Sequence, residues 1–281
     1  KDSDDDKSKD KKDIDSEDNE RSVFGKKFFD TMQSSFMPIN EPNFDGSYVL
    51  DFGDVLEIQF IGQVDSLESY ELKRDGSINV PDIGKILLAG LTLKDASNLV
   101  KAKTENTFIG TEAFISLKNV RDIRVVVAGN AYNPGIYTLN GNSNILHAIT
   151  MAGGIDDFGS YRNIDLIRNN EIIETLDVYD VLLRGSTSFA KSLRSGDSIL
   201  VNPRKKLVTV ESGVLRPGIY ELDDDENIED LIFFANGLDL HSDSEEMFIK
   251  RINKGKSIKL NINYEDIDST LLKNGDSLFI R

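Results

Sequence analysis

The sequence predicts an α+β, strand-rich protein in which a small N-terminal domain precedes two tandem β-grasp-like domains. Three observations carry this prediction. Apolar residues alternate with a period of two from Tyr48 onward, which is typical of strands. Helical patterns are few and short, and no glycine-rich phosphate loop follows a strand, which argues against a doubly wound α/β sheet. The C-terminal part of the chain also repeats itself at an offset of 83 residues, which aligns Val125 with Val208.

The amino-acid composition argues against several classes of function. The 281 residues include 33 Lys plus Arg against 49 Asp plus Glu, a net charge of −16, which argues against binding nucleic acid. The absence of Cys excludes disulfides, thiol nucleophiles and thiolate metal sites. No apolar run approaches the roughly 20 residues of a membrane-spanning helix. Because the first residue is Lys, we expect that an N-terminal leader was removed before this numbering begins.

The N-terminal segment divides into two parts. Residues 1–21 are rich in Asp, Glu and Lys and contain almost no large apolar residue, so we expect a disordered acidic tether. Residues 22–43 predict a short amphipathic helix and a linker, with Ser22 as the N-cap and Pro38 at the end. Its apolar residues recur every four positions and form a candidate docking stripe: Phe24, Phe28, Met32 and Phe36. This stripe either packs on the later domains of the protein or docks on a partner or membrane surface.

Residues 44–122 predict a domain of strands with one helix. Gly53-Asp54 interrupts the first strands, and Asp75-Gly76 predicts a hairpin, because both central positions tolerate positive φ. Thr92 is an expected N-cap, with Asp95 three residues on. A closing strand follows over 114–119.

The repeat defines two further domains, 123–203 and 204–281. Each copy predicts two strands joined by a Pro-Gly turn, then a helix that begins at an Asn and ends at a Gly, and a final Gly-Asp strand. Asn144 and Asn227 are the expected N-caps. The second copy departs from the first where Ser212 replaces Gly129 and Asn236 replaces Gly153.

Gly-Asp precedes alternating apolar residues three times, and we interpret it as a strand start in which Asp bonds a backbone N–H two residues on. The turn and strand-start residues that we expect to serve structure are Gly53, Asp54, Asp75, Gly76, Pro134, Gly135, Gly153, Gly154, Gly196, Asp197, Pro217, Gly218, Gly275 and Asp276.

No chemistry-bearing motif stands out. His147 and His241 belong to no ligand cluster, and the hydrolase and nucleotide signatures are missing. The acidic run over 223–226 could ligate calcium, but acids before a helix are favourable for dipole reasons alone. We therefore expect no catalytic residue, no metal site and no cofactor.

Residues 44–281 resemble the bacterial outer-membrane polysaccharide biosynthesis and export proteins. Tyr48-x-Leu50 with Gly53-Asp54-x-Leu56-x-Ile58, and Arg74-Asp75-Gly76-x-Ile78-x-Val80-Pro81, look like the export domain of that family. Pro134-Gly135-x-Tyr137, Ala148-Ile149-x-x-Ala152-Gly153-Gly154 and Arg162 look like a soluble-ligand-binding β-grasp (SLBB) domain. The repeat predicts a second SLBB domain, more divergent than the first.

The resemblance implies a non-enzymatic subunit of a ring-shaped homo-oligomer that exports capsular or exopolysaccharide. It implies a periplasmic location at the outer membrane, with an N-terminal lipid anchor not present in this numbering. The implied partners are the polysaccharide and an inner-membrane polysaccharide co-polymerase. Because the sequence stops at Arg281, where the best-known members continue into a membrane helix, either that helix is missing or a separate protein forms the outer pore. The alternative is a monomeric periplasmic saccharide-binding or envelope scaffold module.

Overall fold

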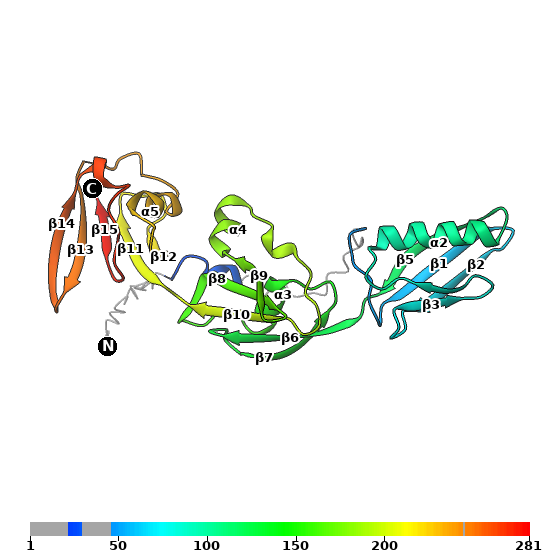
Figure 1. Ribbon diagram of the computed structural model, residues 1–281. Helices are drawn as coiled ribbons and strands as arrows, with labels where there is room; N and C mark the ends of the chain where they lie inside the picture. Colours follow the sequence, from blue (N-terminus) through cyan, green and yellow to red (C-terminus); the bar gives the residue numbers. More distant parts are fainter. Residues whose placement is uncertain (1–21, 30–45, 244) are drawn as a thin grey trace, which may run out of the picture.

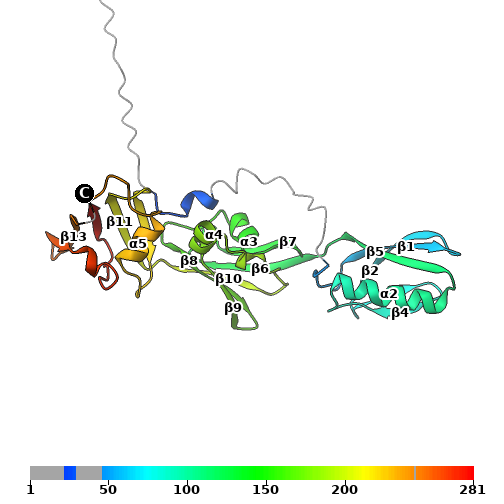
Figure 2. The same ribbon diagram turned by 90° about the horizontal axis from the view of Figure 1, so that it is seen from above.

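The computed structural model describes residues 22–29, 46–243 and 245–281, which form three units in a row (Figures 1 and 2). The N-terminal unit lies at one end and the C-terminus at the other. Strands dominate over helices in every unit, so the predicted α+β, strand-rich class is confirmed. The expected tether over 1–21 lies outside the described residues.

The N-terminal unit packs one helix against two small sheets. One sheet is antiparallel with the order β2-β1-β5, and the other is the β3–β4 hairpin. Its own core includes Leu50, Ile58 and Ile78, all fully buried. The elements are β1 (Val55–Gly62), β2 (Ser66–Glu71), β3 (Ser77–Val80), β4 (Gly84–Leu87), α2 (Leu93–Thr107) and β5 (Thr111–Asn119).

Of two local predictions for the N-terminal unit, the N-cap of α2 is confirmed and the hairpin is wrong. The Thr92 hydroxyl accepts the Asp95 amide at 3.1 Å, which confirms the N-cap of α2. The expected hairpin at Asp75-Gly76 is wrong, because the strands on its two sides belong to different sheets. The Lys73 amide still donates to the Ser77 carbonyl, so the segment is a turn between sheets.

A first five-stranded module follows, with the order β7-β6-β10-β8-β9. Its first and last strands, β6 and β10, pair in parallel, and all its other pairs are antiparallel. Helix α3 packs on the core of the module. The elements are β6 (Asp122–Gly129), β7 (Gly135–Asn140), α3 (Ile145–Met151), β8 (Gly159–Arg168), β9 (Glu171–Leu176), α4 (Val178–Arg184), the 3₁₀ turn η1 (Ser188–Ala190) and β10 (Ser198–Pro203).

The second module repeats this topology strand for strand, with the order β12-β11-β15-β13-β14 and a parallel β11–β15 pair. Such a sheet on one helix matches the β-grasp-like arrangement expected from the repeat. The elements are β11 (Lys206–Ser212), β12 (Gly218–Leu222), α5 (Ile228–Phe234), β13 (Met247–Asn253), β14 (Lys256–Ile262), the 3₁₀ turn η2 (Tyr264–Asp266) and β15 (Ser277–Ile280).

The helix starts of the two modules use the same capping device. The side chains of Asn144 and Asn227 each accept the amide three residues on. In return, His147 Nδ1 accepts the Asn144 amide at 3.2 Å, and the Asp230 carboxylate accepts the Asn227 amide at 3.0 Å. His147 and Asp230 therefore occupy equivalent positions because either side chain closes the capping box.

The two departures of the second copy have conformational explanations. Asn236, which replaces Gly153, has a φ of 69°, and asparagine tolerates this left-handed region better than most residues. Ser212 does not take the role of Gly129. A Cβ at Gly129 would lie 2.2 Å from the Val201 carbonyl oxygen, and Gly213 has the equivalent close approach to Ile280. The close approach has thus moved by one residue, at the register shift of β11.

Candidate functional site at the joint between the two modules

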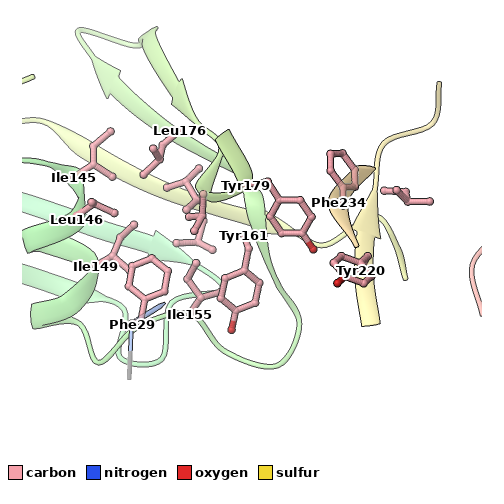
Figure 3. Close-up of a cluster of buried hydrophobic side chains, with 14 of the residues drawn as sticks. Phe29, Ile145, Leu146, Ile149, Ile155, Tyr161, Leu176, Tyr179, Tyr220 and Phe234 are labelled. Atoms are coloured by element: carbon pink, nitrogen blue, oxygen red, sulfur yellow. The ribbon is translucent and has the colours of Figure 1, made fainter. Parts of the chain in front are cut away.

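The two modules share one continuous core, and its largest buried side chains lie where they meet. Tyr179 and Tyr220 are each 1% exposed, and Phe234 contacts Tyr179 with ring centroids 5.3 Å apart (Figure 3). The core of the N-terminal unit is separate. Because the joint buries aromatic rings from both modules, it is a packed interface.

Residues 22–29 cross this joint, and we call them the strap. Val23 pairs in parallel with Ile219 of β12, and the Phe24 amide donates to the Ile219 carbonyl at 2.8 Å. The Phe24 ring lies 4.9 Å from the ring of Tyr179 and 5.4 Å from that of Tyr220. The strap therefore contacts an aromatic residue of each module with one side chain.

The candidate docking stripe falls partly on the strap. Phe24 and Phe28 pack against the shared core, whereas Met32 and Phe36 lie outside the described residues. The more buried residue is Phe29, which is 2% exposed and lies 6.2 Å from the Tyr161 ring (Figure 3). The four-residue period missed Phe29, and the adjacent Phe28-Phe29 pair was the available signal.

Arg162, at the start of β8, carries the charge at the centre of the joint. Its guanidinium lies 4.9 Å from the rings of both Tyr179 and Phe234 and forms ion pairs with Asp177 at 3.0 Å and with Glu226. Burial opposes its charged form, but the hydrogen bond to Glu226 and the charge of Asp177 together raise the pKa of Arg162 above its ordinary value. This arginine joins two acids and two rings from both modules.

Glu221 of β12 is the buried acid of the joint, with 1% exposure. Its carboxylate accepts the Ser160 hydroxyl at 2.7 Å, the Tyr161 amide at 3.0 Å and the Lys205 amide at 3.2 Å. Its own amide donates to the Tyr179 hydroxyl at 2.8 Å. Burial raises the pKa of Glu221 above the usual range of a glutamate, and these hydrogen bonds oppose the shift. No motif in the sequence marks Glu221 as a buried acid.

Two hollows flank the strap. The larger, of about 690 Å³, has apolar walls and includes Pro217 and Gly218 of the predicted turn; the smaller, of about 280 Å³, is more polar. The larger hollow is lined by Phe28, Leu182 and Arg216 among others. The smaller hollow is lined by Lys26, Asp157 and Arg204 among others. Both hollows present cations beside apolar or acidic groups, so they could accept a polar ligand.

The three Gly-Asp motifs form three buried ion pairs far apart from one another. Asp54, Asp197 and Asp276 are at most 1% exposed, and their partners are Arg121, Arg168 and Arg251 at distances of 2.8, 2.7 and 2.6 Å. Each Asp carboxylate also accepts the amide of the residue three positions earlier. The expected bond to an amide two residues on is therefore wrong for these residues. Each pair lies directly before a strand, namely β1, β10 and β15.

The remaining predicted turn residues are scattered. Asp75 binds Lys85 at 2.6 Å, and its pKa lies well below the usual range because of the hydrogen bonds from Lys85 and Ser77. Pro134 precedes β7, which begins at Gly135, and Gly153-Gly154 follows α3. Gly196 and Gly275 have positive φ immediately before their aspartates. Of all these turns, the structure brings Pro217-Gly218 alone to the joint hollows.

Within 22–29, 46–243 and 245–281, no three His, Cys, Asp or Glu side chains gather in a way that could hold a metal ion. In the same ranges, no helix has both the length and the apolar character required to cross a bilayer.

Comparisons with known proteins agree with the order of these units. Residues 43–118 match the family described as "Polysaccharide biosynthesis/export protein", and residues 124–175 match the SLBB domain. Two curated Escherichia coli proteins, both named "Polysialic acid transport protein KpsD", are 27% identical over 180 residues, which are 63% of this chain and 32% of each relative. The chain thus spans about a third of the length of these relatives. The N-terminal unit is thus similar to the polysaccharide biosynthesis/export protein family, and the first module is similar to the SLBB domain.

Proposed function

We propose that this chain is a subunit of an oligomeric translocon that exports capsular or exopolysaccharide and that it contributes a non-catalytic conduit. The observation that carries the proposal is the match to a polysaccharide export domain and to an SLBB domain, in that order, within one chain. The relatives are named for polysialic acid transport, so an acidic polysaccharide is the first substrate class to test.

The second module is proposed as a second SLBB domain. Two observations support this assignment: the second module has the same strand order as the first, and its helix begins with the same capping box. The proposed domains are accordingly 44–122 for export and 123–203 and 204–281 for the two SLBB domains. The motif residues of the three Gly-Asp pairs are proposed to be structural, with no catalytic role.

A conduit needs a hydrated surface that holds the polymer weakly, because tight binding would stop transport. A net charge of −16 suits this requirement for an acidic polymer, since like charges disfavour retention. We propose a periplasmic location at the outer membrane with a lipid anchor. The proposed partners are further copies of the chain, the polysaccharide and an inner-membrane polysaccharide co-polymerase.

The proposal is tested first by oligomeric state. Light scattering over a concentration series, in buffer and in mild detergent, should give one discrete multiple of the 31.4 kDa chain, and particle images should show a central opening. In the source cell, deletion of the gene should leave polymer synthesised but absent from the surface. Unchanged surface polymer after deletion would refute the export role.

The alternative is a monomeric saccharide-binding module, and the two joint hollows favour it. It predicts saturable binding of an oligosaccharide by a 31.4 kDa monomer, measured by calorimetry. A conduit predicts weak binding without saturation in the same titration, because its cargo must be released.

A further inference from the structure

The larger joint hollow, of about 690 Å³, lies where three parts of the chain meet. The strap supplies one wall, which includes Phe24 and Phe28, and the segment leading into β12 supplies another, which includes Arg216 and Pro217. Leu182 of α4 adds the first module, and its side chain is 40% exposed. The volume lies within the range of about 300–1,000 Å³ that is usual for ligand sites. Because the strap, drawn in blue in Figure 2, forms part of the lining, the hollow is complete only while the strap is docked.

The lining of this hollow carries positive charge. Lys27 and Arg216 line it, and no Asp or Glu of the described residues does. The chain as a whole has the opposite balance, with 33 Lys plus Arg against 49 Asp plus Glu. Arg216 also forms no ion pair within the part of the chain that the structure describes. The charge of the hollow is therefore complementary to an anionic ligand.

The Arg216 side chain is held in place by the strap. Its guanidinium carbon lies 5.0 Å from the centroid of the Phe24 ring, and Phe24 itself packs on Tyr179 and Tyr220. A guanidinium that lies over a ring still directs its N–H groups at an acceptor. A carboxylate matches this fork with two parallel hydrogen bonds.

The first module shows that the turn itself does not need this arginine. The offset of 83 residues places Asn133 on Arg216 and Tyr137 on Tyr220. The Tyr137 hydroxyl donates to the Asn133 carbonyl at 2.5 Å, and the Tyr220 hydroxyl donates to the Arg216 carbonyl at 2.7 Å. Because the same backbone bond forms at an asparagine, the Arg216 guanidinium is not required to build the turn.

We propose that the larger joint hollow is a weak subsite for an acidic sugar residue, that Arg216 binds its carboxylate, and that occupancy fastens the strap across the joint. The C–H face of a sugar ring is apolar, so it packs on Phe28 and Pro217 while the carboxylate faces Arg216. The choice of an acidic sugar rests on the proposed export function and on the relatives named for polysialic acid transport. A single charged fork suits a Kd of about 1 mM, which releases the cargo and does not saturate at the micromolar concentrations of calorimetry.

Ligand and strap stabilise each other in this arrangement. A ligand that binds only the docked state lowers the population of the undocked strap by the factor 1 + [L]/Kd. The Phe24 amide reports docking, because it donates to the Ile219 carbonyl at 2.8 Å and its hydrogen exchanges when the strap leaves β12. The exchange rate of the strap therefore measures occupancy of the hollow.

The test is amide hydrogen exchange of residues 22–29 in the full chain, followed by mass spectrometry, with a sialic acid trimer as the probe. At about 10 mM trimer, exchange in the strap should slow by about tenfold. The same trimer with its carboxyl groups reduced to alcohols should have no effect, and equal protection by both trimers would overturn the assignment of a carboxylate site. Protection by decanoate but not by the trimer would also overturn the proposal and would assign the hollow to an acyl chain.

Arg216→Gln tests the residue that binds the carboxylate. The ratio of exchange rates with and without trimer is measured within each variant, so a change in strap docking itself cancels. Arg216→Gln should abolish the tenfold protection. The matched control is Arg74→Gln in the N-terminal unit, where the Arg74 guanidinium lies 5.8 Å from the Phe52 ring, and it should keep the protection. Equal protection in the two variants would overturn the role of Arg216.

The result is independent of the test of the proposed function. If gene deletion removes polymer from the cell surface but the trimer does not protect the strap, the subsite is refuted and the export role stands. If deletion leaves the surface polymer unchanged, the export role is refuted whatever the strap shows.

Discussion

Replacement of Arg162 by Gln should destabilise the joint more than replacement of an exposed arginine by Gln. The Arg162 side chain is 8% exposed, and its acidic partners Asp177 and Glu226 are 20% and 16% exposed. Removing one member of a buried ion pair leaves the other charges without compensation, which costs about 3–5 kcal/mol. Arg162→Lys should lose less, because it keeps the charge but lacks the planar fork and the stacking on both rings.

The assay is urea unfolding followed by far-UV circular dichroism. Because the two modules share one core and the N-terminal unit has its own, we expect two transitions, with the change confined to the transition of the modules. For an m value of about 3 kcal/mol/M, the midpoint should fall by about 1 to 1.7 M. The matched control is Arg184→Gln, whose side chain is 59% exposed and pairs with Asp180, and which should cost about 0.5 kcal/mol.

Arg162 and Arg184 form a matched pair of test sites. Both bind a carboxylate and lie over an aromatic ring, so they differ chiefly in burial and in the number of acids. If Arg162→Gln cost no more than Arg184→Gln, the charges at the joint would be solvated, and the assignment of a buried ion-pair network would be refuted.

Three further predictions concern other buried groups. Burial raises the pKa of Glu221 above the 4.5 of an exposed glutamate, so the folded state takes up a proton first as pH falls. As pH falls from neutral to 4.5, the native chain should therefore gain stability relative to Glu221→Gln. The measurement is the urea midpoint of both proteins at a series of pH values. A difference in midpoint that stays constant with pH would contradict the raised pKa. Asp276→Asn leaves Arg251 without its carboxylate and should cost about 3 kcal/mol in the same assay; a loss below 1 kcal/mol would show that the pair is dispensable. Phe24→Ala removes a half-buried ring and should lower the free energy of unfolding by about 2 kcal/mol. It should also accelerate tryptic cleavage after Lys26. An unchanged cleavage rate would show that the strap docks without the Phe24 ring.

Local and repeated features could be predicted from the sequence. Asn144 and Asn227 cap their helices as expected, because N-capping depends on residues within one turn. The repeat predicted two modules of one design, and both sheets have the same strand order. These predictions succeed because their physical causes act over short stretches of chain or are present twice.

Features that depend on distant partners could not be predicted in the same way. Glu221 lies in an ordinary strand pattern, and its burial results from Ser160 and Tyr161, which are about 60 residues away in the chain. The Asp75-Gly76 turn failed as a hairpin because its flanking strands found partners in other sheets. Phe29 was missed because its burial depends on Tyr161 and not on helical periodicity. Tertiary pairing decided each of these cases.

Buried ion pairs hold both connections between the three units. Arg121 precedes β6 and binds Asp54, so the first connection fixes the N-terminal unit to the strand that opens the first module. The Arg162–Glu226 ion pair holds the second connection, the hydrogen bonds that Glu221 accepts support it, and the strap covers it. An oriented pair of buried charges tolerates little rotation, because a displaced charge loses its partner without regaining water. These ion pairs oppose rotation of the units relative to one another, and the proposed role as a subunit around a conduit requires such resistance.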